Sequence, residues 1–114
     1  MIAVIFEVTP AQGQKKAYLD HAAKLRSLLE NIPGFISVTR FQSLASADTL
    51  LSLSFFEDED AVAAWRNSKP HRESQSAGRS RIFADYRIRI ATVSRDYSLH
   101  DRTQAPTDSN QLHL

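Results

Sequence analysis

The chain has 114 residues, a formal net charge of +1 and no cysteine. One domain of this length can bury a core, and the composition is ordinary for a soluble globular protein. The lack of cysteine excludes disulfides, thiolate metal sites and a cysteine nucleophile, and the near-neutral charge gives no reason to expect nucleic acid or an acidic membrane as a partner.

The beginning of the chain has neither a basic segment nor an apolar run of membrane-spanning length, so we expect a cytoplasmic protein with no membrane partner. Residues 2–9 are rich in β-branched and aromatic side chains, which predicts a first strand. In residues 14–31 the apolar residues recur in steps of three and four, which predicts a helix. The pair Pro33-Gly34 ends that helix.

Two further strands are expected at residues 35–42 and 49–56, joined by a short polar hairpin connection. Four consecutive acids at residues 57–60 then precede an alanine-rich stretch. Because acids favour the positive end of a helix dipole, this pattern predicts a helix at residues 58–67. A metal site is the other interpretation of the same acids, and it is the less favoured one.

A second, short helix is expected at residues 70–77, because proline suits a first helical turn, and a long last strand is expected at residues 82–93. The predicted order is strand, helix, strand, strand, helix pair, strand. This order is typical of the split βαβ or ferredoxin-like fold, an α+β fold with a four-stranded antiparallel sheet. Its helices cover one face of the sheet, and the other face is open.

Several of the expected strands place large apolar side chains on both of their faces. In residues 49–56, for example, Leu51, Leu53 and Phe55 alternate with a second set that contains Leu50 and Phe56. Helices on one side of a sheet cannot bury both sets, and a large exposed apolar patch usually marks an interface. We therefore expect a homodimer that closes through the open sheet face.

The sequence offers few residues for familiar chemistry. It contains neither a glycine-rich phosphate loop nor a Gly-x-Ser-x-Gly elbow, and its four histidines have no metal-ligand spacing, so no metal site is expected. His21 lies beside the apolar stripe of the first helix, and its expected role is that of an ordinary surface residue.

Trp65 and His71 form the most informative pair. Trp65 shares an apolar helix face with Val62; it is either simple core or, because a buried indole N–H seeks a partner, a pocket wall. His71 lies in the first turn of the short helix, where the positive helix end lowers the tendency of imidazole to take up a proton. It is either a neutral proton-transfer group or a partly exposed surface histidine, and Gln75 lies one turn further on.

The run LSLSFFEDEDA at residues 51–61, followed by Trp65 and by His71-x-x-x-Gln75-x-x-x-Arg79, resembles the antibiotic biosynthesis monooxygenase (ABM) family. The segment Ile32-Pro33-Gly34-Phe35 is also similar to the usual entry of that family into its second strand.

The resemblance covers residues 1–95 and leaves residues 96–114 as an extended or partly disordered tail. It implies a dimeric α/β barrel of two ferredoxin-like protomers, each with a pocket between its sheet and its helices. Some members oxidise polycyclic aromatic substrates with molecular oxygen and without metal or flavin. Others of similar fold bind and degrade haem, and many have no known reaction.

The resemblance also marks where this chain departs from its relatives. The tryptophan that matches Trp65 lines the pocket of the cofactor-independent oxygenases, but well-known examples have a tyrosine at the position of His71 and an asparagine at that of Ala61. The haem-degrading relatives have a histidine at the position of Gln75 and an asparagine on the first strand, where this chain has Phe6-Glu7-Val8.

The favoured hypothesis is a cofactor-independent monooxygenase of a small aromatic substrate, with His71 as general base or acid and Trp65 shaping the pocket. The candidate substrate-binding residues are Phe6, Tyr18, Gln75 and Phe83. The alternative is a non-catalytic dimeric module for a small apolar or aromatic ligand. A haem-binding relative is a third and weaker possibility.

Overall fold

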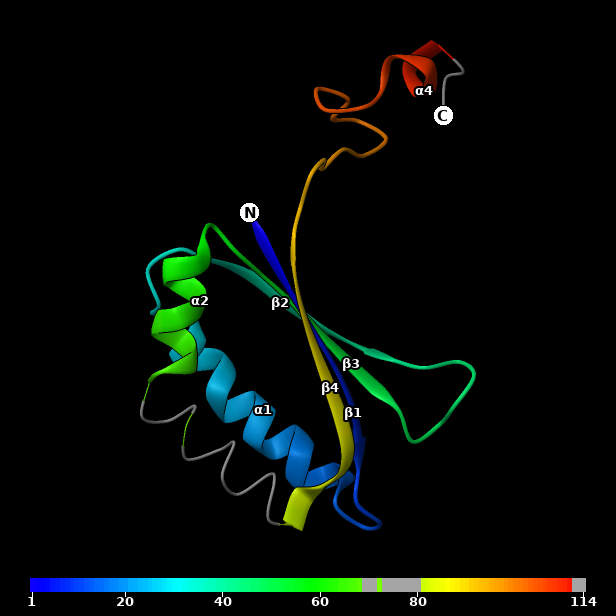
Figure 1. Cartoon of the computed structure of the whole chain (residues 1–114). Helices are drawn as coiled ribbons and strands as arrows, with labels where there is room; N and C mark the ends of the chain where they lie inside the picture. Colours follow the sequence, from blue (N-terminus) through cyan, green and yellow to red (C-terminus); the bar gives the residue numbers. More distant parts are fainter. Residues whose placement is uncertain (69–71, 73–80, 112–114) are drawn as a thin grey trace.

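In the computed structural model, which describes residues 1–68, 72 and 81–111, an antiparallel sheet carries helices on one face (Figure 1). The strands are β1 (Ile2–Pro10), β2 (Phe35–Gln42), β3 (Leu50–Phe56) and β4 (Phe83–Thr92). The helices are α1 (Lys15–Leu29), α2 (Glu59–Arg66) and α4 (Thr107–Gln111). The strand order β2-β3-β1-β4, with every neighbouring pair antiparallel, confirms the predicted ferredoxin-like α+β fold. The helix predicted at residues 70–77 lies outside the described residues.

Helix α1 packs on the sheet through the stripe that the sequence predicts: Tyr18, Ala22 and Leu29 are all buried. After α1 the chain turns into β2 through Gly34, whose φ of 88° lies in the left-handed region that favours glycine. A Cβ at Gly34 would lie 2.7 Å from the Cβ of Ala61 on α2. Glycine is therefore required at position 34 for two reasons: the left-handed backbone and the close approach of α2.

Helix α2 begins at the acidic run, as the sequence predicts. The carboxylate of Asp58 caps the helix by accepting a hydrogen bond from the backbone N–H of Ala61 at 2.9 Å. Glu59 and Asp60 follow in the first turn and are exposed, where they complement the helix dipole. The acids thus form a solvated helix start, and the side chains of Ala61 and Val62 behind them are buried.

The strand register decides which side chains lie under the helices, because directly opposed residues point to the same face of a sheet. The two central cross-strand rows of the inward face lie under α1 and α2, between outer rows that contain Phe56 and Val8. One row consists of Val38, Ser54, Val4 and Ile90, and the other of Arg40, Ser52, Phe6 and Ile88.

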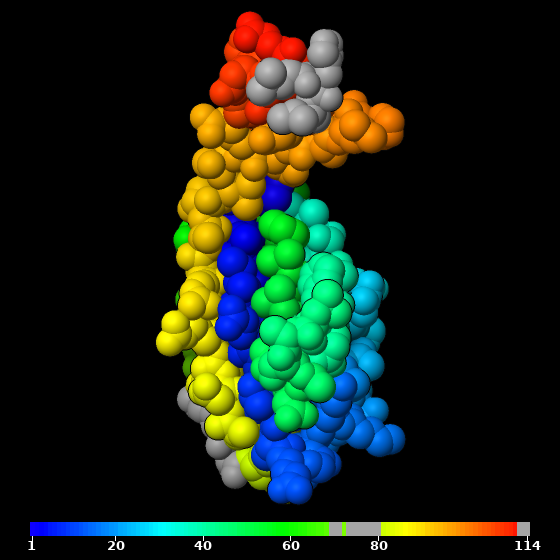
Figure 2. All heavy atoms as spheres, turned by 90° about the vertical axis from the view of Figure 1, so that its right-hand side faces the viewer, coloured from blue at the N-terminus to red at the C-terminus, as the bar shows by residue number. Residues whose placement is uncertain are grey.

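Among the described residues, no helix lies across the opposite face of the sheet, and Figure 2 shows the strands lying side by side there. Its cross-strand rows carry apolar side chains in the middle and one ion pair, in which Arg89 Nη1 lies 3.1 Å from Glu7 Oε1. The apolar members are Ala3, Ile5, Phe41, Leu51, Leu53 and Phe55. The open apolar face that the sequence predicts is therefore present.

Beyond β4 the chain runs away from the sheet and ends in the short helix α4 (Figure 1). The Cα radius of gyration is 16.4 Å, larger than the roughly 13 Å of a compact domain of this length. Within the described part of the chain, no helix is long and apolar enough to cross a membrane. The division into a domain at residues 1–95 and a tail at residues 96–114 stays a prediction.

Candidate functional site

A cavity of about 230 Å³ lies between the sheet and the two helices that cover it. The two central rows of the inward face form its floor, and side chains of α1 and α2 form its roof. On this measure of volume a single water needs only about 10–15 Å³, so the cavity has room for a small organic molecule. Ile88 and Ile90 on the edge strand β4 line it and are 44% and 47% exposed, so the cavity opens along that strand.

Four of the six site residues predicted from the sequence line this cavity, namely Trp65, Phe6, Tyr18 and Phe83. The other two, His71 and Gln75, lie outside the described residues. The structure thus brings together the predicted walls of the pocket, whereas the catalytic role of His71 and Trp65 stays a prediction.

The aromatic walls at one end of the cavity pack edge to face. The ring centroids of Phe6 and Phe83 are 5.7 Å apart, and those of Tyr18 and Phe83 are 6.0 Å apart. Tyr86 joins the group, 5.8 Å from Phe6. Aromatic pairs favour this arrangement, so the cluster gives this end of the cavity rigid walls.

Trp65 belongs to the other half of the cavity. It is half-buried on α2 and packs against a core cluster that includes Val62, Phe56 and Leu29. Val62 and Trp65 both line the cavity, which confirms that their shared helix face points toward the sheet. The wall here is almost entirely apolar, since Val4 and Ile90 complete it.

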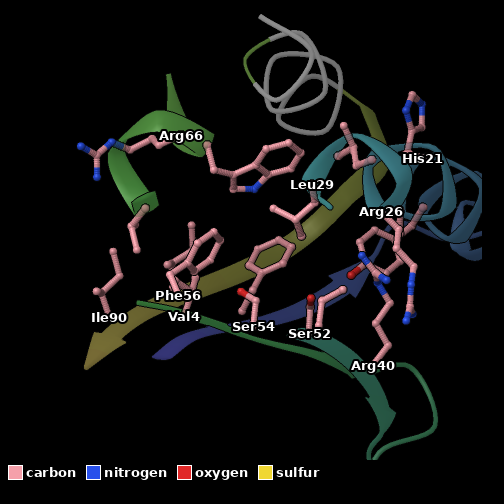
Figure 3. Close-up of a pocket in the computed structure, with 18 of the residues that line it drawn as sticks. Val4, His21, Arg26, Leu29, Arg40, Ser52, Ser54, Phe56, Arg66 and Ile90 are labelled. Atoms are coloured by element: carbon pink, nitrogen blue, oxygen red, sulfur yellow. The ribbon is translucent and has the colours of Figure 1, made fainter. Parts of the chain in front are cut away.

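Sequence reasoning missed the polar residues of the site. Arg40, Ser52 and Ser54 line the cavity from the floor, and the half-buried His21 lines it from α1, where the sequence predicts only a surface residue (Figure 3). The alternation of the strands could have indicated the three floor residues. Arg40 alternates in phase with the buried Val38, and the two serines alternate in phase with the buried Phe56.

Cationic groups gather at one end of the cavity. In Figure 3 the side chains of Arg26 and Arg40 reach the same end, whereas the imidazole of His21 points away from them and Arg66 points away at the opposite end. The Nε atom of Arg40 is buried and has no hydrogen-bond partner among the described residues. No acidic side chain is among the described residues that line the cavity.

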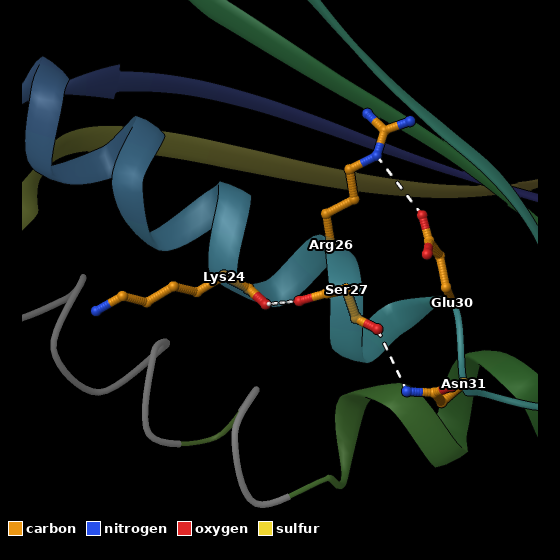
Figure 4. A network of polar contacts seen from close by, with 5 residues as sticks. All are labelled: Lys24, Arg26, Ser27, Glu30 and Asn31. Carbon is orange, nitrogen blue, oxygen red and sulfur yellow. Dashed lines mark hydrogen bonds and ion pairs between the residues drawn. The ribbon is translucent and has the colours of Figure 1, made fainter.

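Arg26 differs from Arg40 in having an acidic neighbour. Its Nε lies 3.9 Å from Oε1 of Glu30, one helical turn further along α1 (Figure 4). The same helix end is held by Ser27, whose Oγ donates to the carbonyl of Lys24 at 3.0 Å, and by Asn31, whose amide donates to the carbonyl of Ser27 at 3.3 Å. Glu30 therefore partly neutralises the charge of Arg26, whereas no acidic side chain of the described lining does the same for Arg40.

Burial raises the pKa of the Tyr18 hydroxyl above its ordinary value, and the nearby Arg40 guanidinium opposes this rise. Since the direction is upward from about 10, Tyr18 is a neutral phenol at physiological pH. It can therefore donate a hydrogen bond into the cavity. Within the described part of the chain, no group of three His, Asp or Glu side chains could hold a metal ion.

The family model for antibiotic biosynthesis monooxygenases matches residues 1–77, about two thirds of the chain. The chain belongs to the antibiotic biosynthesis monooxygenase family. This confirms the resemblance seen in the sequence, and the cavity lies where the family resemblance places its pocket, between sheet and helices.

Two curated relatives match most of the chain. It is 42% identical over 94 residues to a Pyricularia oryzae protein named jasmonate monooxygenase ABM; the match covers 82% of this chain and 44% of that protein. The chain thus spans less than half the length of this relative. It is also 29% identical over 102 residues to an uncharacterised Bacillus subtilis protein, YqjZ, with 89% of this chain and 86% of that protein covered.

Solved structures share the fold at low identity. SnoaB, a cofactor-independent oxygenase from Streptomyces nogalater, matches with a TM-score of 0.73 at 14% identity over 83% of this chain and 94% of its own. A protein from Mycobacterium tuberculosis matches with a TM-score of 0.76 at 13% identity over 85% and 98% of the two chains. These likenesses support the fold of the ABM chain and carry no argument about its substrate.

Ala61 stands where the resemblance implies an asparagine, and the structure shows what surrounds it. Ala61 is 5% exposed and packs toward Gly34, and it is not among the described residues that line the cavity. The chemistry available to the cavity therefore comes from other positions. The described lining offers an apolar wall that includes Trp65 and polar groups at Arg40 and Tyr18.

Proposed function

We propose that this ABM protein is a monooxygenase that holds a small apolar substrate in the cavity and transfers to it one atom of molecular oxygen. The observation that supports this most is the cavity itself, with Trp65 and the aromatic cluster as walls on a chain of this family. A dry pocket protects radical and peroxide species from water, which direct chemistry with oxygen requires.

The chemistry we propose uses neither metal nor flavin. A base removes a proton from an activated C–H or O–H group of the substrate, and the resulting anion gives an electron to oxygen. If a ring methylene becomes a carbonyl, the second oxygen atom leaves as water and the substrate itself supplies all four electrons. His71 is the proposed base because imidazole titrates closest to neutrality.

Two substrate classes follow from different observations. The electron-rich aromatic class, such as an anthrone, follows from the need for a stabilised anion. The name of the Pyricularia relative favours a jasmonate, a carboxylate on a largely hydrocarbon skeleton. Hydroxylating an unactivated carbon of that skeleton would need two more electrons, so assays of jasmonate are run with and without a nicotinamide reductant.

We also propose that the working form is a homodimer closed through the open sheet face. The apolar side chains there include Ile5, Leu53 and Phe55, and a monomer would leave them half-covered in water. The chain beyond β4 extends past the sheet, where it could contact a second copy (Figure 1). A cytoplasmic location remains the prediction from the sequence.

Incubation with ¹⁸O₂ tests the proposed reaction. We expect a product that carries one ¹⁸O atom, and we expect no product under argon. The variant His71→Ala should slow turnover by about 100-fold or more, as loss of a general base does. Turnover that continues without oxygen would contradict the proposal.

The ligand-binding alternative has a different signature. A non-catalytic module would bind the same compounds tightly, give no product under any of these conditions and tolerate His71→Ala. Haemin titration tests the third possibility, since a haem-binding relative would shift the Soret band.

A further inference from the structure

The position of Arg40 in the sheet is unusual for an arginine. It lies on the inward face of β2, in one cross-strand row with Ser52, Phe6 and Ile88, and all four residues line the cavity. An inward-facing guanidinium is costly to bury unless an anion or a hydrogen-bond acceptor compensates it. The fold keeps this cation under the helices, so its compensating partner is to be sought in the cavity.

Among the described residues the partner of Arg40 is a neutral group, the Tyr18 hydroxyl, which shares a side-chain hydrogen bond with the guanidinium. The Nε atom of Arg40 is buried and has no hydrogen-bond partner among the described residues. The described lining holds further cationic groups, including Arg26 at the same end, but no carboxylate, and Glu30 lies against Arg26 instead. A low-dielectric cleft lined by charges of one sign concentrates ions of the opposite sign. This end of the cavity is therefore built to receive an anion.

Tyr18 adds a second donor at the same place. Its hydroxyl is close enough to Arg40 for the guanidinium to influence its pKa, and burial keeps the phenol protonated. Ser52, next to Arg40 in the row, adds a third donor, a hydroxyl. A planar guanidinium that offers two parallel N–H donors, with a phenol beside it, matches the geometry of a carboxylate.

We propose that Arg40 and Tyr18 form a carboxylate-binding subsite, and that the ligand of the cavity is an apolar carboxylic acid. Its hydrocarbon body lies against the wall made by Trp65, Phe56 and Ile90, and its carboxylate lies on Arg40. The inference rests on the proposed function only in taking the cavity as the substrate site. It favours the carboxylate class over the uncharged aromatic one and adds the residues that would select it.

The fluorescence of the single tryptophan makes ligand binding measurable without turnover. Trp65 is the only tryptophan of the chain and lines the cavity, so its fluorescence reports occupancy in the absence of oxygen. The probes are two acid and ester pairs, jasmonate with methyl jasmonate and 4-phenylbutyrate with its methyl ester. We expect at least one acid to bind about 10- to 100-fold more tightly than its ester, the range that hydrogen bonds to charged groups provide.

The variants assign this preference to the subsite. Arg40→Gln should remove most of the preference by weakening the acid and leaving the ester nearly unchanged, and Tyr18→Phe should weaken the acid several-fold. Arg66→Gln is the matched control, because this arginine borders the cavity but points away from it, and the acid-to-ester ratio should stay at the wild-type value (Figure 3). Arg40→Lys keeps the charge but loses the planar pair of N–H donors, so its acid-to-ester ratio should lie between those of the wild type and Arg40→Gln.

The proposal is overturned if the wild-type protein prefers neither acid over its ester, which is a measurement that needs no variant. It is also overturned if a folded Arg40→Gln protein keeps the wild-type ratio or weakens acid and ester equally. Failure of the proposed function looks different. In that case acids bind through Arg40, but no ¹⁸O enters any product.

Discussion

The middle of β3 carries opposite kinds of side chain on its two faces. Under the helices, where a core is expected, the strand places Ser52 and Ser54 between the buried Leu50 and Phe56. On the open face, where solvent is expected, it places Leu51, Leu53 and Phe55. An ordinary half-buried strand has the reverse pattern, with apolar side chains toward the helices and polar ones toward water.

Each half of this inversion has its own physical consequence. A serine is small, so two of them on the floor leave the space that becomes the cavity, and their hydroxyls add polar groups to it. Leu51 and Leu53 on the open face are half-buried in a single chain, so a second copy that covers them would add part of the roughly 1.5–3 kcal/mol that full burial of a leucine provides. The same strand thus makes room for a ligand on one side and prepares an interface on the other.

The largest expected effect comes from placing a charge on the open face. Leu53→Glu should dissociate the proposed dimer, because a buried, unpaired carboxylate costs about 3–5 kcal/mol and appears in both copies. Leu44→Glu is the matched control, since Leu44 is fully exposed in the hairpin loop. Analytical ultracentrifugation over a dilution series measures the result. A wild-type protein that sediments as a monomer, or a Leu53→Glu protein that stays dimeric, would contradict the interface.

A second variant tests how firmly the helices are held over the inward face. Gly34→Ala should lower the free energy of unfolding by about 2–4 kcal/mol, because it combines a left-handed backbone with a contact of 2.7 Å to the Cβ of Ala61. Gly13→Ala separates the two causes. Its φ is 77° with open space around it, so only the backbone cost of about 1–2 kcal/mol is expected.

Urea unfolding monitored by circular dichroism measures both variants. If the two glycine variants lose equal stability, the close approach of α2 to the turn is not what requires glycine at position 34.

A third variant fills the space that the serines leave. Ser54 is 8% exposed, and Ser54→Val should raise the free energy of unfolding by about 1 kcal/mol through added apolar burial while lowering ligand affinity about tenfold. Ser37→Val makes the same change on the opposite face and should leave affinity unaltered. Thermal unfolding and Trp65 fluorescence titration provide the two readouts. Loss of stability in Ser54→Val with unchanged affinity would mean that the cavity floor is not where the ligand lies.

Much of this arrangement could be predicted from the sequence because it depends on local patterns. The periodicity of α1, the acidic start of α2 and the Pro33-Gly34 turn are recorded in consecutive residues, and the strands follow from β-branched and aromatic runs. Phe6 and Tyr18 were predictable as walls because they sit on faces whose direction the period gives. Phe83 alternates out of phase with Ile88 and lines the cavity beyond the register shift between β1 and β4.

The cationic end of the cavity was not predicted, because it depends on long-range register. Arg40 and Tyr18 belong to different elements, and only the pairing of β2 with β3 under α1 brings them to one place. A single arginine in an alternating strand carries no local sign that its neighbours leave it uncompensated. His21 was assigned to the surface for the same reason, since the tertiary packing decides which helical residues line a cavity.

The smallest expected effect concerns the titration of Tyr18 beneath the helices. Its pKa is raised by burial, with Arg40 opposing the rise, so the folded state favours the protonated phenol. The stabilisation is therefore complete below the unfolded pKa near 10 and is lost as pH rises through the higher folded value. Tyr18→Phe should flatten the alkaline side of the stability profile.

Absorbance near 295 nm follows the three tyrosines of the chain directly. We expect Tyr18→Phe to remove the phase whose pKa is raised by burial, and Tyr97→Phe, in the segment beyond β4, to leave that phase in place. An apolar acid bound beside Arg40 should move this phase to still higher pH, because its carboxylate cancels the cation that favours tyrosinate. If the methyl ester moves this phase equally, desolvation alone explains the shift, and the contrast between a charged and an apolar end of the cavity has no effect on Tyr18.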